Sequence, residues 1–472
     1  MQRVKMRWGI VLALAIGTAA PATAAEQLRG AEIPLWEGLP FAGLLLSIAL
    51  GPIFARKLWH VHYGKAAAFW AMLALGMLVV TQGLMPTVAA FLHSMLADYL
   101  PFILMLFALY TAAGGIVVSE LKRATPLANT ALLALGTLAA SVIGTTGASM
   151  ILIRPILQAN AKRPRQVHVV IFFIFLVSNI GGVLSPLGDP PLFFGFLRGI
   201  SFFWPLHMLW PQMLFCAGLL LIAFFLLDSY FFRKEKRTPS NPNEPWPGFT
   251  VRGLPNLALI AAAVGVILTS AVWRPGISVD VLDIHLELQN VLRDVSLLAI
   301  GIAALMVTPL ADHKANHFVW APFTEVAKIF VAIFIAIIPV ITMLAAGARG
   351  SFAPVIALLA HADGKPNEAA YFWATGLLSS FLDNAPTYLV FFGMAGGDPT
   401  ALMGPLAKTL EAISLGAVFM GAFTYIGNAP NFMVYAMARR ARVEMPGFFG
   451  YMIWSIGILV PMFVLVTVLF LR

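Results

Sequence analysis

Apolar stretches of about 20 residues recur along the whole chain, and each has the length that a helix needs to cross a lipid bilayer. A helix also satisfies its own backbone polar groups in lipid. Only 11% of the residues are charged, whereas soluble domains carry about 25%. The sequence therefore predicts an all-α polytopic membrane protein of about ten transmembrane helices. They are expected at 39–55, 66–84, 99–119, 167–197, 209–231, 255–273, 295–310, 325–344, 408–438 and 448–471.

The formal net charge of +9 is carried mainly by Lys and Arg residues in short loops between the apolar stretches. Such clusters mark the cytoplasmic loops of a membrane protein. We therefore expect the lipid bilayer, and no nucleic acid, to be the partner of this basic chain.

The first 25 residues have the pattern of a secretory signal peptide. Arg3, Lys5 and Arg7 precede a short apolar run, and Ala22-Thr23-Ala24 provides a small-residue cleavage site. We therefore expect a multi-pass protein of a bacterial inner membrane, with its mature N-terminus in the periplasm. The alternative is an uncleaved first helix.

Two further apolar stretches, 127–159 and 369–396, are predicted to be re-entrant hairpins. The first is flanked by Lys122-Arg123 and by Lys162-Arg163, which both belong on the cytoplasmic side. A segment that leaves and returns to one side cannot be a single span. For the charges to alternate correctly afterwards, the second stretch must also re-enter, from the periplasm.

Each half of the chain then has the same order of elements: three spans, a hairpin, a long span and a final span. The first half begins outside and the second begins inside, so the halves are predicted to be two inverted-topology repeats, 26–232 and 256–472. A polar cytoplasmic linker, 233–255, joins them. This plan is common in secondary transporters, and it places the C-terminus in the periplasm.

The long span of each repeat, 167–197 or 408–438, is predicted to be a broken helix. Glycine and proline gather near its middle, at Gly181–Pro191 in the first and Gly427–Pro430 in the second. Interrupted backbone at membrane depth is tolerated only where protein or a water-filled cavity satisfies it. Such interruptions are the best sequence indicator of a transport site.

Two carboxylates lie at these features, Asp189 in the first break and Asp383 in the second hairpin. A charge inside the membrane is costly unless it is paired, hydrated or bound to an ion. Carboxylate, hydroxyl and amide oxygens suit Na⁺, and a buried carboxylate can carry a proton instead. We therefore predict Asp189 and Asp383 as Na⁺ ligands. The remaining predicted ion-binding or substrate-binding residues are Thr145, Thr146, Ser149, Asn179, Asn384, Thr387, Asn428 and Asn431.

Simpler roles are open for several of these groups. Asp189 and Asp383 each precede the start of a predicted half-helix and could cap it. Asp228, Glu325 and Glu411 lie near the ends of spans, where interfacial positions are expected. Beyond these five acids, the sequence places one arginine inside the first hairpin.

Arg154 is that arginine, and its long side chain is expected to reach the cytoplasmic surface. The alternative for Arg154 is a role in holding an anionic substrate.

The segments Ser178–Gly182, Gly188–Pro191, Phe381–Pro386 and Tyr425–Asn431 resemble the ion transporter superfamily. It includes sodium/proton antiporters, arsenite permeases and citrate or dicarboxylate carriers. The likeness is strongest to its bacterial branch of citrate transporters and sodium/proton antiporters. The resemblance implies a scaffold domain that forms a homodimer and a transport domain that moves like an elevator. The dicarboxylate carriers show Ser-Asn-Thr at the hairpin tips, and this chain does not.

The two acids favour sodium/proton antiport, with Na⁺ and H⁺ as transported ions and no cofactor. The alternative is cation-coupled transport of citrate, another organic anion or an arsenite-like oxyanion. An intramembrane aspartyl protease would also use two carboxylates, but the sequence lacks its Tyr-Asp motif. We therefore expect a transporter and not an enzyme.

Overall fold

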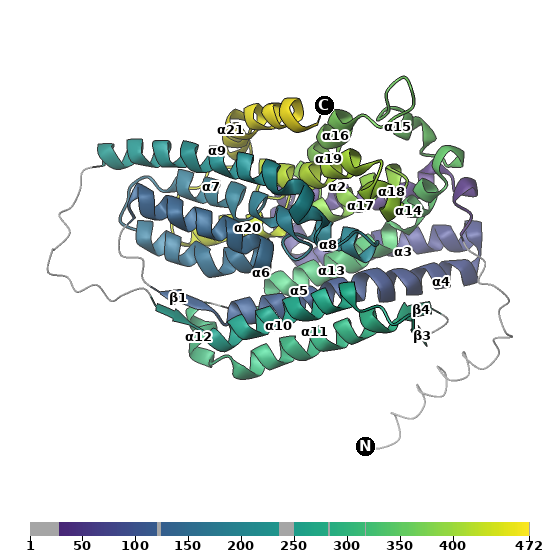
Figure 1. Ribbon diagram of the computed structural model, residues 1–472, viewed down its shortest axis with the longest axis horizontal. Coiled ribbons are helices and arrows are strands. Elements are labelled where there is room, and N and C mark those ends of the chain that lie inside the picture. The colour runs from purple at the N-terminus through teal and green to yellow at the C-terminus, as the bar shows by residue number, and fades with distance from the viewer. Residues whose placement is uncertain (1–27, 120–123, 236–249, 282–283, 317, 472) are drawn as a thin grey trace, which may run out of the picture.

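The computed structural model describes residues 28–119, 124–235, 250–281, 284–316 and 318–471. They form an elongated bundle of helices (Figure 1). The predicted signal peptide and most of the predicted linker lie outside the described residues.

The helices of the first half are α2 (Leu39–Phe54), α3 (Arg56–Gln82), α4 (Leu84–His93), α5 (Leu100–Gly114), α6 (Pro126–Asn160), α7 (Val167–Leu176), α8 (Pro190–Leu197) and α9 (Trp204–Lys234). Short helical turns occur at Gly30–Glu32, Leu35–Gly38, Ser94–Tyr99 and Ile180–Leu184.

The helices of the second half are α10 (Leu254–Val272), α11 (Leu288–Val307), α12 (Leu310–Ala315), α13 (Ala321–Ala336), α14 (Ile338–Ala345), α15 (Ala353–Ala357), α16 (Glu368–Phe381), α17 (Asn384–Met394), α18 (Pro399–Met403), α19 (Ala407–Phe419), α20 (Ala429–Arg440) and α21 (Phe448–Phe470). Its short turns are Gly347–Arg349 and Met420–Phe423.

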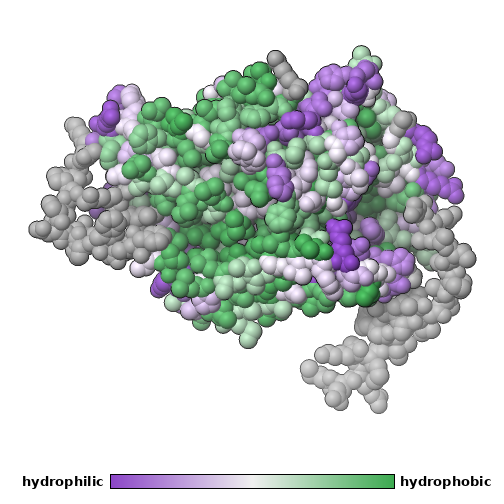
Figure 2. All heavy atoms as spheres, in the orientation of Figure 1, coloured by the Kyte–Doolittle hydropathy of each residue, from purple (hydrophilic) through white to green (hydrophobic). Residues whose placement is uncertain are grey.

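The number of candidate membrane-spanning helices agrees with the predicted all-α membrane protein. Within the described residues, nine helical segments are long and apolar enough to cross a membrane, or ten with one bent pair. Large apolar side chains also remain on the surface: Val80 is 85% exposed, Met306 81% and Ile453 73%. Hydrophobic residues cover much of the visible face, and strongly hydrophilic ones gather mainly near its ends (Figure 2). Lipid is the environment that stabilises such a surface.

The bent pair corrects one predicted span. The stretch 325–344 was expected to form one helix, but α13 and α14 meet at an angle of 42°. Pro339 lies in the first turn of α14, where its ring fits but prevents a continuous helix from α13.

Two pairs of short antiparallel strands lie among the helices, and the sequence analysis did not predict them. β1 (Val117–Ser119) pairs with β2 (Thr250–Arg252), and β3 (Ser278–Val281) pairs with β4 (Ile284–Glu287). The first pair joins the segment after α5 to the segment before α10, so it connects the two halves of the chain.

Helix α6 folds back on itself at Gly144. This glycine has φ 80° and ψ 150°, a conformation that L side chains rarely adopt. Near the two ends of α6, Asn129 Nδ2 donates to Asn160 Oδ1 over 3.0 Å. A straight helix would hold these residues about 46 Å apart. The chain therefore reverses at Gly144, giving a first arm before it and a second arm from Thr145 to Asn160.

Both 167–197 and 408–438 contain interrupted helices. In the first, a helical turn at Ile180–Leu184 and an extended residue, Ser185, separate α7 from α8. In the second, Met420–Phe423 and the extended Thr424 separate α19 from α20. Because the backbone leaves the helix at these places, α8 and α20 have their own N-termini inside the bundle.

Close backbone contacts fix the shape of each interruption. A Cβ atom on Gly188 would lie 2.0 Å from the carbonyl oxygen of Gly182. The second interruption repeats the contact, with a Cβ on Gly427 lying 2.8 Å from the carbonyl oxygen of Gly421. Helix packing completes the core: α8 lies against α17, α20 against α6, and α16 against α19.

Substituting Gly188→Ala should destabilise the protein, because the added methyl group collides with backbone that cannot move away. We expect a loss of about 1–3 kcal/mol, measured as a lower midpoint of thermal unfolding in detergent. Gly457→Ala is the matched control, since nothing lies within 4 Å of its Cβ in the exposed face of α21. The control should be neutral or slightly stabilising. Equal midpoints for the two variants would contradict the prediction.

Candidate ion and substrate site

Four helix N-termini meet at the carboxylate of Asp189. The second arm of α6 brings Thr145, whose hydroxyl donates to Asp189 Oδ1 over 3.0 Å. Asn428, just before α20, donates to the same oxygen over 3.2 Å. Asn384, the first residue of α17, donates to Asp189 Oδ2. Asp189 itself precedes α8.

This convergence makes the centre of the bundle favourable for negative charge. The first turn of a helix presents N–H groups that its own backbone does not use, together with a partial positive charge. Four helix starts surround the buried Asp189 carboxylate, 1% exposed, although the first turn of α8 begins with two prolines that have no N–H group. The site can therefore hold an anion, or a cation that binds Asp189.

Asp189 does not cap its own helix, although the sequence left that role open. Pro190 and Pro191 occupy the first turn of α8, and the Asp189 side chain makes no capping hydrogen bond there. All three of its side-chain donors come from other segments. Its carboxylate thus joins both hairpins to both interrupted helices.

Asn384 has an oxygen without a partner at this junction. Its amide nitrogen donates to Asp189, while its buried Oδ1 has no hydrogen-bond partner among the described residues. Leaving such an acceptor unpaired costs about 1–3 kcal/mol. A cation beside the Asp189 carboxylate would use this oxygen, since amide and carboxylate oxygens are the ligands that hard cations prefer.

Asp383 caps a helix and also faces a cavity. Its Oδ1 accepts a hydrogen bond from the backbone N–H of Ala385 over 3.2 Å, at the start of α17. It also lines the cavity described below, together with Asn428. Asp189 does not line that cavity, but it lies near enough for the charges of the two acids to interact. The two predicted Na⁺ ligands therefore occupy different environments.

The three remaining predicted hydroxyl residues differ in their surroundings. Thr146 lines a small cavity of about 50 Å³ together with Asp383 and Asn428. The hydroxyl of Ser149 instead bonds that of Ser178 over 2.9 Å, and Thr387 donates to the Asp383 carbonyl within α17. In this conformation, these last two hydroxyls support the fold. An ion-binding role for them stays a prediction.

Asn179 and Asn431 connect the two interruptions directly. Asn179 Nδ2 donates to Asn431 Oδ1 over 2.7 Å. Asn431 Nδ2 in turn donates to the carbonyl oxygens of Gly421 and Thr424. Their amides thus donate to backbone carbonyl groups near the breaks, including that of Ile174.

A hydrogen bond in the first half has a counterpart in the second half, and each of its residues is the same number of positions from its counterpart. Ser185 donates to the carbonyl of Ser141, and Thr424 donates to that of Ser380. Residues 185 and 424, like residues 141 and 380, are 239 positions apart. The same offset relates the Gly182 and Gly188 contact to the Gly421 and Gly427 contact.

This offset shows which residue of the other half corresponds to each of the two acids. Position 189 corresponds to Asn428, and position 383 corresponds to Gly144. Each interruption thus carries one polar residue before its second helix, an acid in the first half and an amide in the second. The signal was present in the sequence, as Gly188-Asp189-Pro190 and Gly427-Asn428-Ala429.

A cavity of about 540 Å³ leads away from the site along α6 and α20. Pockets for small organic ligands typically measure about 300–1,000 Å³. At its inner end lie Asp383 and Asn428, and Arg154, Arg439 and Arg440 also line it. Helix α20 ends at Arg440, and we call that end of the molecule the Arg439 end. Arg154 is half-buried in the cavity wall, and its guanidinium donates to the Ala315 carbonyl in an exposed part of the structure. Its predicted reach to the cytoplasmic surface stays a prediction.

The opposite end of the site is closed by packing. Phe194 of α8 lies 5.0 Å from Phe102 and 5.1 Å from Phe334, measured between ring centroids. Just beyond α8, Arg198 forms an ion pair with Asp98 at 3.1 Å. The structure is therefore open on the Arg439 side and shut on the other.

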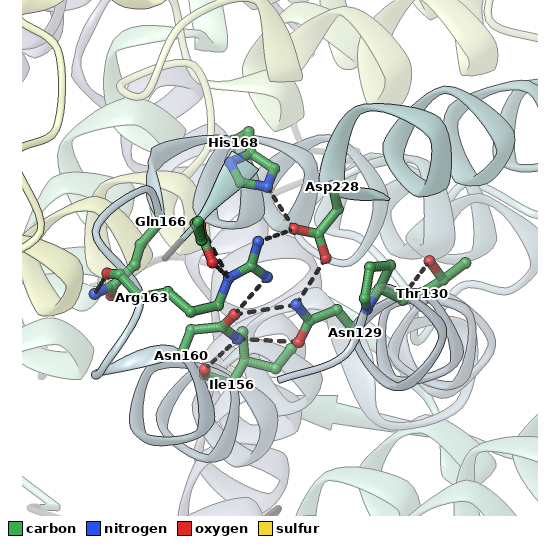
Figure 3. A network of polar contacts seen from close by, with 10 residues as sticks. Asn129, Thr130, Ile156, Asn160, Arg163, Gln166, His168 and Asp228 are labelled. Carbon is green, nitrogen blue, oxygen red and sulfur yellow. Dashed lines mark hydrogen bonds and ion pairs between the residues drawn. The ribbon is translucent and has the colours of Figure 1, made fainter. Parts of the chain in front are cut away.

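A buried polar network holds the base of the α6 hairpin (Figure 3). Asp228 of α9 accepts hydrogen bonds from Asn129 at 3.0 Å and His168 at 2.8 Å, and it pairs with Arg163 at 2.6 Å. Asn160 bonds Asn129 and accepts from Arg163. The network fixes both arms of the hairpin to α9 and so positions its tip beside Asp189.

Two acids expected at the membrane interface are in fact fully buried. Asp228 belongs to the network just described. Glu411 of α19 accepts hydrogen bonds from Gln212 at 2.5 Å and Lys408 at 2.9 Å. Both side chains are 0% exposed, because charged partners compensate them. The partners of Asp228 and the Gln212 partner of Glu411 are distant in sequence, whereas Lys408 lies one turn before Glu411 on α19.

The fold and site define a multi-pass membrane transporter, with interrupted helices and a central polar site that opens to one side. A comparison with family models finds a match over residues 30–471 to the family described as "Putative citrate transport". The chain belongs to this family, within the ion transporter superfamily, and is therefore a transporter and not an enzyme. No curated protein matches the sequence. The family match favours the citrate alternative over the sodium/proton antiport that the two acids suggested.

Breaking the network at the hairpin base should destabilise the protein. Asp228→Asn removes the closest carboxylate of the Arg163 guanidinium, which keeps only its pair with Glu235 at 3.0 Å. Breaking a buried pair completely costs about 3–5 kcal/mol, so the remaining pair should keep the loss below that range. The midpoint of thermal unfolding in detergent should fall markedly.

The control is Asp280→Asn, whose ion pair with His285 is largely exposed and so contributes little. An Asp228→Asn midpoint as high as that of the control would show that the network does not stabilise the fold.

Proposed function

We propose that this protein is a secondary active transporter that couples the movement of a citrate-type organic anion to a cation gradient. The 540 Å³ cavity carries the proposal, because it joins a centre of four helix N-termini to a wall with three arginines. Helix N-termini and guanidinium groups are the groups that bind carboxylates in proteins. The family description supports the same substrate class.

Asp189 is the proposed binding group for the coupling cation. Its carboxylate accepts from the Asn384 amide, whose Oδ1 is unpaired among the described residues, so both residues offer oxygens to a cation. When Na⁺ or a proton neutralises Asp189, the helix N-termini around it become free to attract an anion. Cation and anion would thus assist each other in binding, which is the requirement for coupled transport.

The two halves are proposed to be inverted repeats, supported by the constant offset of 239 residues between their contacts. The Arg439 end would face the cytoplasm of a bacterial inner membrane, in agreement with its basic residues. Alternating access would then exchange the open cavity for an opening at the Arg198 end. Elevator-like movement and a homodimer follow from the superfamily resemblance.

Sodium/proton antiport is the second candidate. Two acids near the centre, Asp189 and Asp383, favour it, because cations that compete with protons for carboxylates can be exchanged. The cavity-lining position of Asp383 gives ions a path to that carboxylate.

Purified protein in proteoliposomes should take up radiolabelled citrate when an inward Na⁺ or proton gradient is applied. Asp189→Asn keeps the side-chain size but removes the charge, so the cation concentration for half-maximal uptake should rise about 10–100-fold. The exposed Asp363→Asn is the control and should match the wild type. Citrate uptake with no dependence on either cation would refute coupling, and no uptake at all would refute the substrate class.

The antiport candidate predicts a different result in everted membrane vesicles. Adding Na⁺ should collapse a preformed pH gradient reported by a dye, and Asp383→Asn should abolish the response because it removes the cavity-facing acid. A wild-type protein that gives no response to Na⁺ or Li⁺ between about pH 6 and 9 would rule this candidate out.

A further inference from the structure

Arg154 occupies an unusual position for a cationic side chain. It lies on the second arm of α6, in the otherwise apolar segment Met150–Ile156, and lines the cavity that ends at Asn428. Its Nη1 donates to the carbonyl of Ala315 at the end of α12. The guanidinium thus lies in the cavity wall.

Arg154 also lacks the carboxylate that accompanies other arginines inside this protein. Arg163 pairs with Asp228, Arg198 with Asp98, and Arg293 with Asp294. Within the described part of the chain, no carboxylate lies within 4.0 Å of Arg154. Its one hydrogen bond runs from Nη1 to the carbonyl of Ala315, at 2.9 Å.

Among the residues that the structure describes, this one hydrogen bond leaves most of the five N–H donors of the guanidinium without a protein partner. A charged side chain at membrane depth is costly unless it is compensated. The planar fork of Arg matches a carboxylate with two parallel hydrogen bonds. The cavity is the open space that such a carboxylate would enter.

We propose that Arg154 is a carboxylate-binding residue of the transported anion and that it confers preference for tricarboxylates over dicarboxylates. This inference rests on the proposed function. The helix N-termini around Asn428 hold the two carboxylates that dicarboxylates and tricarboxylates share, and Arg154 holds the third, on the side toward Arg439 and Arg440. A substrate without that carboxylate gains nothing from Arg154.

A purely structural role would instead use Arg154 to anchor the end of α12 through Ala315. The two roles differ in what the side chain must retain. Gln can still donate to the Ala315 carbonyl but carries no charge, whereas Lys keeps the charge and loses the planar fork. Arg165→Gln is a matched control, because Arg165 is an exposed arginine just beyond the hairpin base and does not line the cavity.

The test measures initial uptake of citrate, tricarballylate and glutarate by full-length protein in proteoliposomes. In Arg154→Gln, the KM for the two tricarboxylates should rise about 10-fold or more, while the KM for glutarate and the maximal rates stay within about 2-fold. Arg154→Lys should fall between this variant and the wild type. Arg165→Gln should match the wild type for all three substrates.

The proposal is overturned if Arg154→Gln lowers the maximal rates of all three substrates and leaves every KM unchanged. That pattern would assign Arg154 to the support of α12. If the wild type takes up none of the three anions, the proposed function fails, and citrate binding in detergent decides the role of Arg154. A citrate-induced rise in the wild-type midpoint of thermal unfolding that disappears in Arg154→Gln supports the proposal, whereas no rise or an equal rise in both overturns it.

Discussion

The organisation of this protein depends on one buried carboxylate placed where four helices begin. Asp189 receives hydrogen bonds from Thr145, Asn384 and Asn428, which belong to three different segments. Unpaired N–H groups at helix N-termini favour a negative charge, and an isolated carboxylate in lipid requires donors. The helix N-termini stabilise the Asp189 carboxylate, and the carboxylate in turn stabilises the helix N-termini. Its hydrogen bonds connect α6, α17 and the residue before α20.

The surrounding structure maintains this arrangement with backbone contacts and buried polar groups. The Gly182 and Gly188 contact and its counterpart in the second half give the interruptions their shape. The network around Asp228 fixes the base of the α6 hairpin. Packing at the Arg198 end contrasts with the cavity at the Arg439 end, so a nearly symmetric centre lies in an asymmetric surrounding.

Much of the helical framework could be predicted from local sequence, because apolar length, glycine and proline act on the backbone where they occur. The number of spans and the importance of Gly188 and Pro190 follow from such rules. The partners of Asp189 and Asp228 could not be predicted in this way, since they come from segments distant in sequence. The two acids favoured antiport, whereas the family match and the arginine-lined cavity favour an organic anion.

The replacement of one acid by an amide has an electrical consequence. Asp189 corresponds to Asn428, so the paired interruptions contribute one fixed negative charge where strict symmetry would give two. Moving one elementary charge through the membrane potential involves about 2.3 kcal/mol per 100 mV. In the proposed cycle, a carrier that returns with Asp189 ionised would move one more negative charge than a carrier that returns with a bound proton or Na⁺, whatever charge Asp383 and the cavity arginines carry. The occupancy of Asp189 would thus change which part of the cycle the membrane potential accelerates.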